Sequence, residues 1–333
     1  MIMVLTAAAL AASPVPPRPV NGGPAITRLE ATHAPSGEGP ASGEETLQLA
    51  RLPDLRLTVG IAVGTEGPFR FLVDTAADRS AVSRQLAERL KLPAGRDALL
   101  HSVTGVSKVS TAAVRGLQVA SRTLPEVNAP LLDADHVGAD GILGTDVLRS
   151  AMVRFDFREQ LLTITPSGRD LSRSTDPNTI VVEARRRSGR LIVTEAELDG
   201  QRLTVVLDTG SEVSIGNEAL RRALSRRGLL TGEKPVVLGS VTGSTLPASY
   251  MKAKHLVVGG VTLNGLGIAF AEAHTFKVMG INNRPALLLG MNALQAFDSL
   301  TIDMATRKLR FVMPSGAGKA DQFADASGTR RGG

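Results

Sequence analysis

The stretch Val205-Val206-Leu207-Asp208-Thr209-Gly210-Ser211 runs three strand-forming apolar residues directly into a carboxylate, a hydroxyl and a glycine. A short apolar run that ends in turn-forming residues is typical of a buried β-strand. Placing the carboxylate of Asp208 at the end of such a strand costs desolvation free energy, which is tolerated mainly where the charge is paired or used. Asp, Thr and Gly are also ordinary turn residues, so this stretch alone fits a plain strand and turn equally well.

The same pattern occurs a second time, at Phe71-Leu72-Val73-Asp74-Thr75-Ala76-Ala77, with the two aspartates 208 − 74 = 134 residues apart. Further landmarks recur in the same order in both copies. They are Ser80 with Ser214, Ser102-Val103-Thr104-Gly105 with Ser240-Val241-Thr242-Gly243, residues 141–148 with 287–294, and closing hairpins at 155–164 and 302–312. Landmarks that recur in one order at a nearly constant offset indicate a duplicated domain.

The composition limits the classes of protein to which the chain can belong. A length of 333 residues allows two modest domains, and 43% hydrophobic with 21% charged residues is typical of a soluble globular protein. Only 3% of the residues are aromatic, which predicts an aliphatic core and argues against a base-stacking surface for nucleic acid. The absence of cysteine excludes a thiolate nucleophile and a cysteine-based metal site.

Charged and metal-binding residue types give weaker signals. The net charge of +6 includes arginine clusters at residues 185–187 and 221–227, which we interpret as solvated faces and helix ends rather than as a nucleic-acid surface. The five histidines show no ligand spacing, so no metal site and no cofactor are predicted. Asp133, Asp135 and Asp140 could touch a cation but are interpreted as a solvated turn.

The N-terminal residues 1–12 are apolar and rich in alanine, and prolines follow them directly. This pattern resembles the core of a secretory signal with a cleavage point around residues 11–13, although no basic residue precedes it. The segment is too short to span a bilayer, and no other stretch qualifies as a transmembrane helix. We therefore expect an exported protein, periplasmic or secreted. The predicted organisation is a signal segment at 1–12, a disordered linker at 13–45, a first half at 46–166, a linker at 167–178, a second half at 179–313 and a disordered tail at 314–333.

Local patterns predict a mainly β chain with at least one short helix in each half. Alternating apolar residues indicate strands, and turn or capping residues mark where the elements begin and end. The expected elements are strands over 55–63, 69–73, 191–198 and 203–207, an Asp199-Gly200 hairpin turn, helices over 84–90 (with Ser83 as N-cap) and 218–225, a helical turn over 147–151, and a hairpin over 101–119 with Gly105 near its tip.

The duplication gives the two aspartates a possible chemistry. If the copies pack about a pseudo-twofold axis, Asp74 and Asp208 face each other at the centre. Two carboxylates at roughly 3 Å cannot both ionise easily, so they share a proton. One then acts as general base on a water molecule, while the other donates a proton to the carbonyl of a scissile amide. Neither a metal ion nor a covalent intermediate is needed for this reaction.

With these motifs the chain resembles the aspartic proteases, specifically two tandem retropepsin-like domains of the kind found in exported bacterial proteins. The resemblance covers both copies. It rests on Asp74–Ala77 and Asp208–Ser211, on the apolar-apolar-glycine segments Ile142–Gly144 and Leu288–Gly290, and on Asn292 in the place of the asparagine of the retropepsin Gly-Arg-Asn element. The implied fold is a pair of closed β-barrel or sandwich halves, related by a pseudo-twofold axis.

The resemblance also implies roles for residues of this chain. Asp74 and Asp208 would be catalytic, and Thr75 and Thr209 would grip each other across the halves. Ser80 and Ser214 are expected to form hydrogen bonds near the aspartates rather than to act as nucleophiles, because nothing supplies a matched base. The remaining implied residues are Ala76 and Gly210 in support of the active site, and Thr104, Gly105, Thr242 and Gly243 in flap hairpins over the cleft.

The chain departs from the family pattern at several points. Ala76 replaces a glycine and adds a methyl group where backbones crowd, Asp146 stands in the Asn-like position of the first half, and neither flap carries an aromatic residue at its expected tip. Two functions therefore stay open: an aspartic endopeptidase, or a catalytically silent module of the same fold that binds a peptide or a partner. We expect a monomer acting on a peptide or protein, without nucleic acid, although each half could also pair with a half of another chain.

Overall fold

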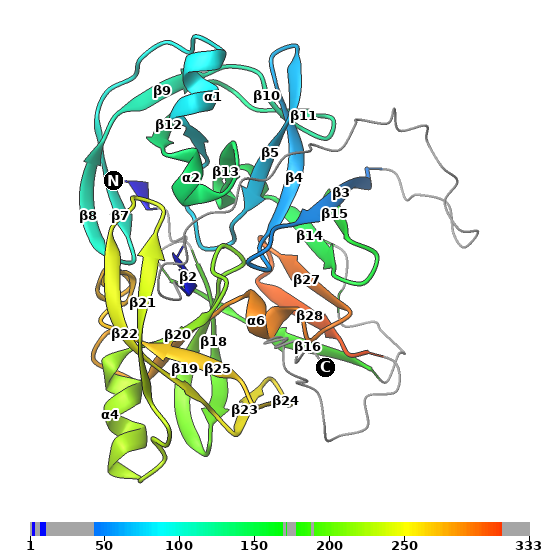
Figure 1. Cartoon of the computed structure of the whole chain (residues 1–333). Coiled ribbons are helices and arrows are strands. Elements are labelled where there is room, and N and C mark those ends of the chain that lie inside the picture. Colours follow the sequence, from blue (N-terminus) through cyan, green and yellow to red (C-terminus); the bar gives the residue numbers. More distant parts are fainter. Residues whose placement is uncertain are drawn as a thin grey trace, which may run out of the picture.

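The structure is a computed structural model that describes residues 2–3, 7–10, 43–168, 171, 178–187 and 190–314. Almost all of the predicted linker at 13–45, most of the linker at 167–178 and almost all of the predicted tail at 314–333 lie outside the described residues. The chain is mainly β and forms two retropepsin-like halves, one above the other in Figure 1, with six short helices in the described ranges.

One antiparallel sheet is shared by the two halves. Each half contributes three strands, and the two sets meet where β14 pairs with β27, with Val153 opposite Ile302. The order of the strands is mirrored on the two sides of this pairing, so the pseudo-twofold axis passes between β14 and β27. Across the sheet the strands are β16 (Thr179–Glu183), β28 (Lys308–Val312), β27 (Ser299–Asp303), β14 (Ala151–Asp156), β15 (Leu161–Pro166) and β3 (Glu45–Arg51).

The first half continues from β3 into a strand hairpin that leads to Asp74. The hairpin is formed by the two predicted strands, and its second strand pairs in parallel with a short buried strand, Leu72 opposite Ile142. The strands of this half are β4 (Leu57–Val63), β5 (Glu66–Val73), β6 (Ala81–Ser83), β9 (Thr111–Val114), β10 (Leu117–Val119), β11 (Arg122–Thr123), β12 (Val127–Leu132) and β13 (Gly141–Leu143).

The second half repeats this arrangement. Its hairpin turns at Asp199 and Gly200, which both have positive φ angles (48° and 76°), as the Asp-Gly signal predicts. The strand that leads to Asp208 pairs in parallel with a second short buried strand, with Val206 opposite Leu288. The strands of this half are β17 (Arg185–Arg187), β18 (Arg190–Leu198), β19 (Gln201–Leu207), β20 (Ser214–Gly216), β23 (His255–Val258), β24 (Val261–Asn264), β25 (Gly267–Phe270) and β26 (Ala286–Leu289).

The helices are short, and the two predicted ones are confirmed. The side chain of Ser83 accepts a hydrogen bond from the N–H of Leu86 and caps α1, while Asn217 caps α4 in the same way. The predicted helical turn at 147–151 was misplaced, since the chain is helical over 145–148 and enters β14 at Ala151. None of the helices in the described ranges is long and apolar enough to cross a membrane. The helices are α1 (Arg84–Arg89), α2 (Ala134–Val137), α3 (Thr145–Leu148), α4 (Glu218–Arg226), α5 (His274–Val278) and α6 (Met291–Leu294).

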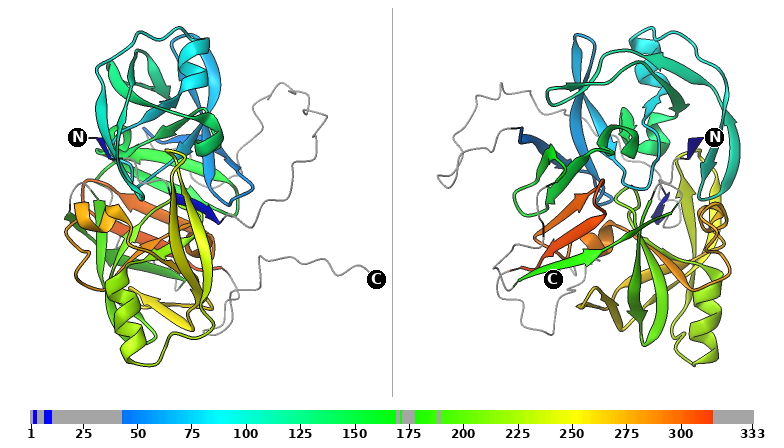
Figure 2. Two further views of the ribbon diagram at one scale, coloured as in Figure 1. Left: turned by 60° about the vertical axis from the view of Figure 1, so that its left-hand side comes forward. Right: turned by 180° about the vertical axis from the view of Figure 1, so that it is seen from behind.

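Each half also sends out one hairpin toward the other half, visible on the left of Figure 1 and on the right of the second view in Figure 2. The first flap consists of β7 (Ala98–Ser102) and β8 (Gly105–Val109), and the second of β21 (Lys234–Ser240) and β22 (Thr245–Lys252). The first hairpin is shorter than the predicted 101–119, because the chain turns at Val103 and Thr104 and β8 already ends at Val109. Gly105 begins β8, next to the tip.

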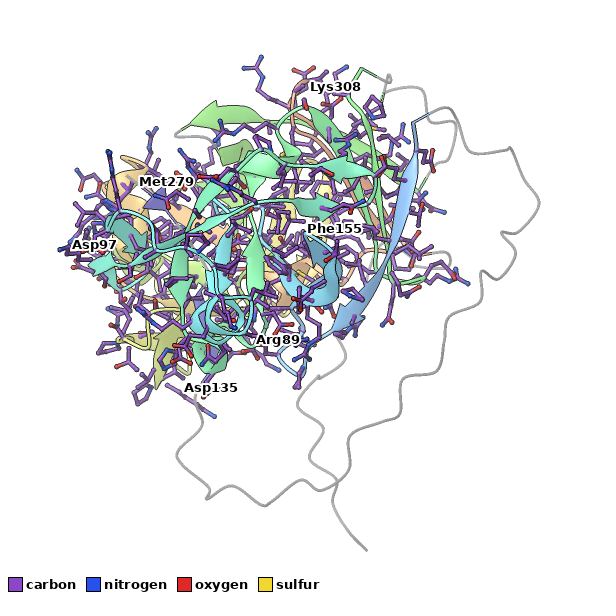
Figure 3. All side chains as sticks on the ribbon, turned by 90° about the horizontal axis from the view of Figure 1, so that it is seen from above. Arg89, Asp97, Asp135, Phe155, Met279 and Lys308 are labelled. Carbon is purple, nitrogen blue, oxygen red and sulfur yellow. The ribbon has the colours of Figure 1, made fainter. Side chains whose placement is uncertain are left out.

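The core is aliphatic, as the composition predicts. Most of the buried side chains are Val, Leu, Ile or Ala, and the few aromatic ones, such as Phe155 in β14 of the shared sheet, are buried as well. Viewed from above, Asp97, Asp135 and Lys308 lie toward the outline of the molecule, whereas Phe155 lies within it (Figure 3). The buried β-strands thus form a rigid support from which the two aspartate loops project.

Candidate active site

The two aspartates occupy equivalent positions at the ends of two buried strands. The N–H of Asp74 donates to the carbonyl of Leu143 (3.0 Å), and the N–H of Asp208 donates to the carbonyl of Leu289 (3.0 Å). Both aspartates are fully buried. Parallel pairing with β13 and β26 therefore fixes the point at which each of the two strands ends and the chain turns into the Asp-Thr segment.

Thr75 and Thr209 bind each other across the interface between the halves. The N–H of Thr75 donates to Oγ1 of Thr209 (3.0 Å), and the N–H of Thr209 donates to Oγ1 of Thr75 (3.2 Å). Each hydroxyl in turn donates to a carbonyl of the opposite half, Thr75 to Leu207 (3.3 Å) and Thr209 to Val73 (2.7 Å). Four buried hydrogen bonds thus hold the two aspartate loops together.

Backbone amides of each loop hold the adjacent carboxylate. Oδ1 of Asp74 accepts from the N–H groups of Ala76 (2.7 Å) and Ala77 (2.9 Å), and Oδ1 of Asp208 accepts from the N–H of Gly210 (3.0 Å). Such bonds orient a carboxylate and favour its ionised form, whereas burial opposes ionisation. The Oδ2 atoms of both side chains are buried as well.

Gly210 brings the two carboxylates together. A Cβ atom at this position would lie 2.5 Å from Cγ and 2.5 Å from Oδ2 of Asp74, far inside van der Waals contact. Only glycine therefore allows the Asp74 carboxylate to lie against this segment of the other half. Because the N–H of Gly210 also binds Asp208, both acidic side chains contact the same residue. The side chains that the sequence placed on opposite sides of a pseudo-twofold axis are neighbours in the structure.

The methyl group of Ala76 is accommodated in the second half. Ala76 is fully buried and belongs to an apolar cluster that includes Val206, Ile215 and Leu288. The departure from the family glycine thus fills space between the halves with apolar surface. Burial of a methyl group of this kind stabilises the folded state by about 0.8 kcal/mol.

Ser80 and Ser214 brace the two loops in the same way. The hydroxyl of Ser80 donates to Oδ1 of Asp146 (2.8 Å), and the hydroxyl of Ser214 donates to Oδ1 of Asn292 (2.8 Å). Each serine also accepts from a backbone N–H, that of Gly144 in the first half (3.1 Å) and that of the equivalent glycine in the second (3.1 Å). Asp146 therefore stands in the first half where Asn292 stands in the second, and both hydroxyls serve as structural links.

The tip of each flap is buried in the opposite half. Val103 at the tip of the first flap is fully buried in an apolar cluster made mostly of second-half residues, including Phe276. Val241 at the tip of the second flap is 2% exposed and packs in a first-half cluster with Leu72. Thr104 and Thr242 lie in the two turns, each with its hydroxyl beside that of a preceding serine (2.9 and 3.2 Å).

Each flap is contacted by one histidine of the opposite half, and no role was assigned to either histidine from the sequence. The N–H of His274 in α5 donates to the carbonyl of Val103 (2.8 Å), and its ring stacks on that of His101 in the first flap, with centroids 5.1 Å apart. In the second flap, a Cβ on Gly243 would lie 2.4 Å from Cε1 of His136 in α2. Neither contact has a signal in sequence spacing, because each joins segments that only the docking of the halves brings together.

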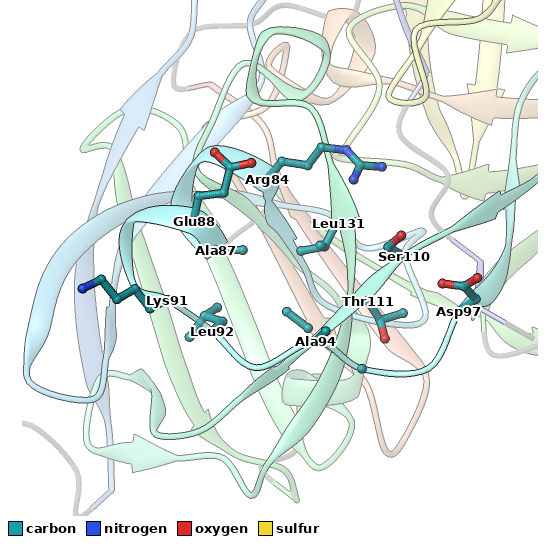
Figure 4. A pocket seen from close by; sticks show the side chains of 12 residues that line it. Arg84, Ala87, Glu88, Lys91, Leu92, Ala94, Asp97, Ser110, Thr111 and Leu131 are labelled. Atoms are coloured by element: carbon teal, nitrogen blue, oxygen red, sulfur yellow. The ribbon is translucent and has the colours of Figure 1, made fainter.

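A pocket of about 320 Å³ opens on the first half beside α1, away from the dyad (Figure 4). Its lining includes Arg84, Glu88 and Asp97, but neither Asp74 nor Asp208. The mixture of charges and the absence of the acidic pair from its lining separate this pocket from the candidate active site.

The acidic residues of the 133–140 segment have structural partners. Asp133 caps α2 by accepting from the N–H of Asp135 (3.0 Å), and Asp140 accepts from the N–H of Arg70 (2.8 Å). The predicted turn is thus corrected in part, because residues 134–137 of this segment form helix α2, which Asp133 caps. Over the described parts of the chain, no three His, Asp or Glu side chains gather as the ligands of a metal ion would.

The fold and the paired loops define a two-half protein of the retropepsin-like class. The sequence model of the aspartyl protease family matches residues 41–147 and 194–293, one match on each half, and each match contains one of the two aspartates. Together the matches cover more than half of the chain, so the chain belongs to the aspartyl protease family. A comparison with curated proteins finds no significant match.

Proposed function

We propose that the chain is an aspartic endopeptidase that hydrolyses peptide bonds with a water molecule activated by Asp74 and Asp208. The observation that carries the proposal is the meeting of both carboxylates at Gly210, in loops locked by the reciprocal Thr75–Thr209 hydrogen bonds. Two equivalent carboxylic acids that meet at one point are suited to act together, as one acid–base pair.

The proposed reaction uses the two acids in different protonation states. One carboxylate takes a proton from the attacking water, while the other, protonated, donates its proton to the carbonyl oxygen of the scissile bond. The resulting tetrahedral diol collapses when a proton reaches the leaving nitrogen, which breaks the C–N bond and releases an amine and a carboxylic acid. The grip between Thr75 and Thr209 keeps the carboxylates positioned, which lowers the entropic part of the barrier.

A cleavage assay tests the proposal directly. The purified protein is incubated with a peptide library between about pH 3 and 7, the range in which such acid pairs operate, and products are identified by mass spectrometry. We expect cleavage that a statine-type inhibitor blocks and that falls by at least about 100-fold in Asp74→Asn and in Asp208→Asn. Asp199→Asn is the matched control, because Asn-Gly forms the same hairpin turn as Asp-Gly. Absence of cleavage throughout this range would overturn the proposal.

A silent binding module is the second candidate, and the methyl group of Ala76 is the observation that favours it. This group lies in the loop of one catalytic carboxylate, where the family has glycine, so it could hold the pair in an unproductive geometry. If so, the wild-type protein binds peptides without turnover, the binding survives both Asn substitutions, and Ala76→Gly gains cleavage that the wild type lacks. Cleavage by the wild type itself eliminates this candidate.

We also propose that one chain supplies both halves of the site as an exported monomer. The antiparallel pairing of β14 with β27 supports assembly within a chain, because it joins the halves through a continuous sheet. The apolar residues 1–12 support export. Sedimentation of the purified protein tests the first point, with a dimer as the contrary result, and N-terminal sequencing of protein from separated cell compartments tests the second.

A further inference from the structure

A second pocket, with a volume of about 220 Å³, lies on the sheet that the two halves share. Its lining includes side chains from four neighbouring strands, β15 and β14 of the first half and β27 and β28 of the second (Figure 1). Neither Asp74 nor Asp208 lines it. The pocket therefore spans the pairing of β14 with β27, where the halves meet, and is separate from the candidate active site.

Threonine and arginine alternate in one row across this pocket. Arg154 is paired with Thr163 on one side and with Thr301 on the other, and Thr301 is paired in turn with Arg310. Residues that are directly paired in neighbouring strands share one face of the sheet, and like charges directly opposite each other are unfavourable. A threonine between the two arginines keeps them off adjacent positions. Each half thus contributes one guanidinium group and one hydroxyl to the same surface.

The hydroxyl of Thr301 has no hydrogen-bond partner among the residues that the structure describes. Thr301 is only 5% exposed, and it lines the pocket. Buried polar groups are nearly always hydrogen-bonded, either within the protein or to a bound molecule. A buried hydroxyl without a partner, at the wall of a pocket, therefore indicates that the pocket holds an acceptor or a donor for it.

The pocket also carries more positive than negative charge. Arg310 is half-buried, and its Nε and Nη2 atoms both donate to the carbonyl of Leu171; within the described ranges no carboxylate pairs with it. Nη2 of Arg154 donates to Oδ2 of Asp156 (2.7 Å), which leaves the other N–H groups of this guanidinium for a further acceptor. Glu44 also lines the pocket, but it is exposed, so water and salt screen its charge.

We propose that this pocket binds a small oxyanion of the phosphate type, held by the guanidinium groups of Arg154 and Arg310 and by the hydroxyl of Thr301. The planar fork of N–H donors on arginine matches the oxygen atoms of phosphate. The volume of about 220 Å³ lies below the range of roughly 300–1,000 Å³ for pockets that take drug-sized ligands, which favours a small ion. An anion held in this way joins the two halves, and its binding does not depend on the proposed function.

A calorimetric titration of the full-length protein with inorganic phosphate tests the proposal. It is carried out near neutral pH, at an ionic strength that sodium chloride holds constant. We expect saturable binding, and an affinity lower by at least about 10-fold in Arg310→Gln and in Thr301→Val, because each removes a hydrogen bond to a charged ligand. Glu44→Gln should bind phosphate several-fold more tightly, since it removes a like charge from the lining.

Two features of the variants keep the test decisive. Arg84→Gln is the matched control, because it removes an arginine from the lining of the other pocket, beside α1, and should keep the wild-type affinity. Thr301→Val removes a hydroxyl without a partner and keeps the shape of a strand residue, so it should fold even if Arg310→Gln does not. Phosphate should raise the melting temperature of the wild type and leave that of Thr301→Val unchanged.

Glycerol 3-phosphate in the same titration distinguishes two sources of the anion. Weaker binding than that of inorganic phosphate assigns the site to the free ion, whereas equal binding assigns it to a phosphate monoester such as a headgroup; either result upholds an oxyanion site. Three results would overturn it: no saturable binding of phosphate by the wild type, wild-type affinity in Thr301→Val, or an equal loss in Arg84→Gln and Arg310→Gln. None of these results depends on whether peptides are cleaved.

Discussion

Nδ1 of His101 lies 2.9 Å from Nε2 of His274, so a hydrogen bond joins the first flap to helix α5 of the other half. A bond between two imidazoles needs an unprotonated nitrogen as the acceptor. Burial lowers the pKa of His274, and the proximity of His101 and of Lys277 lowers the pKa further. The contact between flap and helix therefore depends on the protonation of this pair.

The lowered pKa gives the pH dependence of the flap a definite sign. A histidine whose pKa is lower in the folded state than its ordinary value of 6.5 stabilises the fold fully above that value, and this stabilisation is lost as the pH falls through the folded pKa. We expect hydrogen exchange of residues 98–109, corrected for the intrinsic rate, to increase several-fold between about pH 7 and pH 5. In His101→Gln this increase should be much smaller, and an unchanged increase would contradict the role of the pair.

The reciprocal threonine contacts predict a loss of stability when either hydroxyl is removed. Thr75→Val and Thr209→Val keep the shape of the side chain but leave the buried N–H of the partner threonine without its acceptor. We expect each substitution to lower the free energy of unfolding by about 1–3 kcal/mol in chemical denaturation. Thr75→Ser and Thr209→Ser retain the hydroxyl and are the matched controls. A valine variant as stable as its serine counterpart would show that the grip contributes nothing.

The contact between Gly210 and Asp74 predicts a loss of activity from a single methyl group. In Gly210→Ala the new Cβ would displace the carboxylate of Asp74, from which it would lie only 2.5 Å away. A displacement of about 1 Å at reacting groups lowers the rate by about 100-fold, and we expect a loss of at least this size in peptide cleavage. Gly239→Ala, at a flap position with open space around the new Cβ, is the control. Wild-type activity in Gly210→Ala would mean that the carboxylates do not act from this geometry.

The equivalence of Asp146 and Asn292 predicts that one can replace the other. In Asp146→Asn the amide oxygen can accept from Ser80, as the amide oxygen of Asn292 accepts from Ser214. We expect the free energy of unfolding of this variant, measured by thermal denaturation, to stay within about 1 kcal/mol of the wild type. Asp146→Ala leaves the buried hydroxyl of Ser80 without its acceptor and should lower the free energy of unfolding by about 1–3 kcal/mol. Similar losses in the two variants would show that the charge of Asp146, rather than its acceptor geometry, is what the loop requires.

Repetition in the sequence made much of the fold and the central site predictable. The hairpin at Asp199-Gly200, the helix capped by Ser83 and the strands that lead to Asp74 and Asp208 all follow from local patterns, because turn and capping residues act on their own neighbours. The duplication then placed the two aspartates on equivalent loops. The sequence also predicted that Asp146 stands in the position of Asn292, whereas the hydrogen bonds of these two residues to Ser80 and Ser214 came from the structure.

Contacts between the halves were not predictable in the same way. The burial of Val103 and Val241 in the opposite core, and the approach of His274 to the first flap, depend on how two folded halves dock. The strands at Ile2–Met3 and Ala7–Leu10 were missed for a related reason. A short Ala-rich stretch has no strand period of its own, and its backbone becomes a strand only against an edge that tertiary structure supplies.

The exchange of flap tips makes admission to the cleft a movement of the entire molecule. Lifting the first flap withdraws Val103 from the second core, and lifting the second withdraws Val241 from the first, each at roughly 1.5–3 kcal/mol of lost burial. Neither flap can open while the two halves remain fully packed around its tip. Opening is thus coupled to a loosening of both lobes, and any mutation that tightens the seam between them will slow the entrance of a ligand without touching the acids.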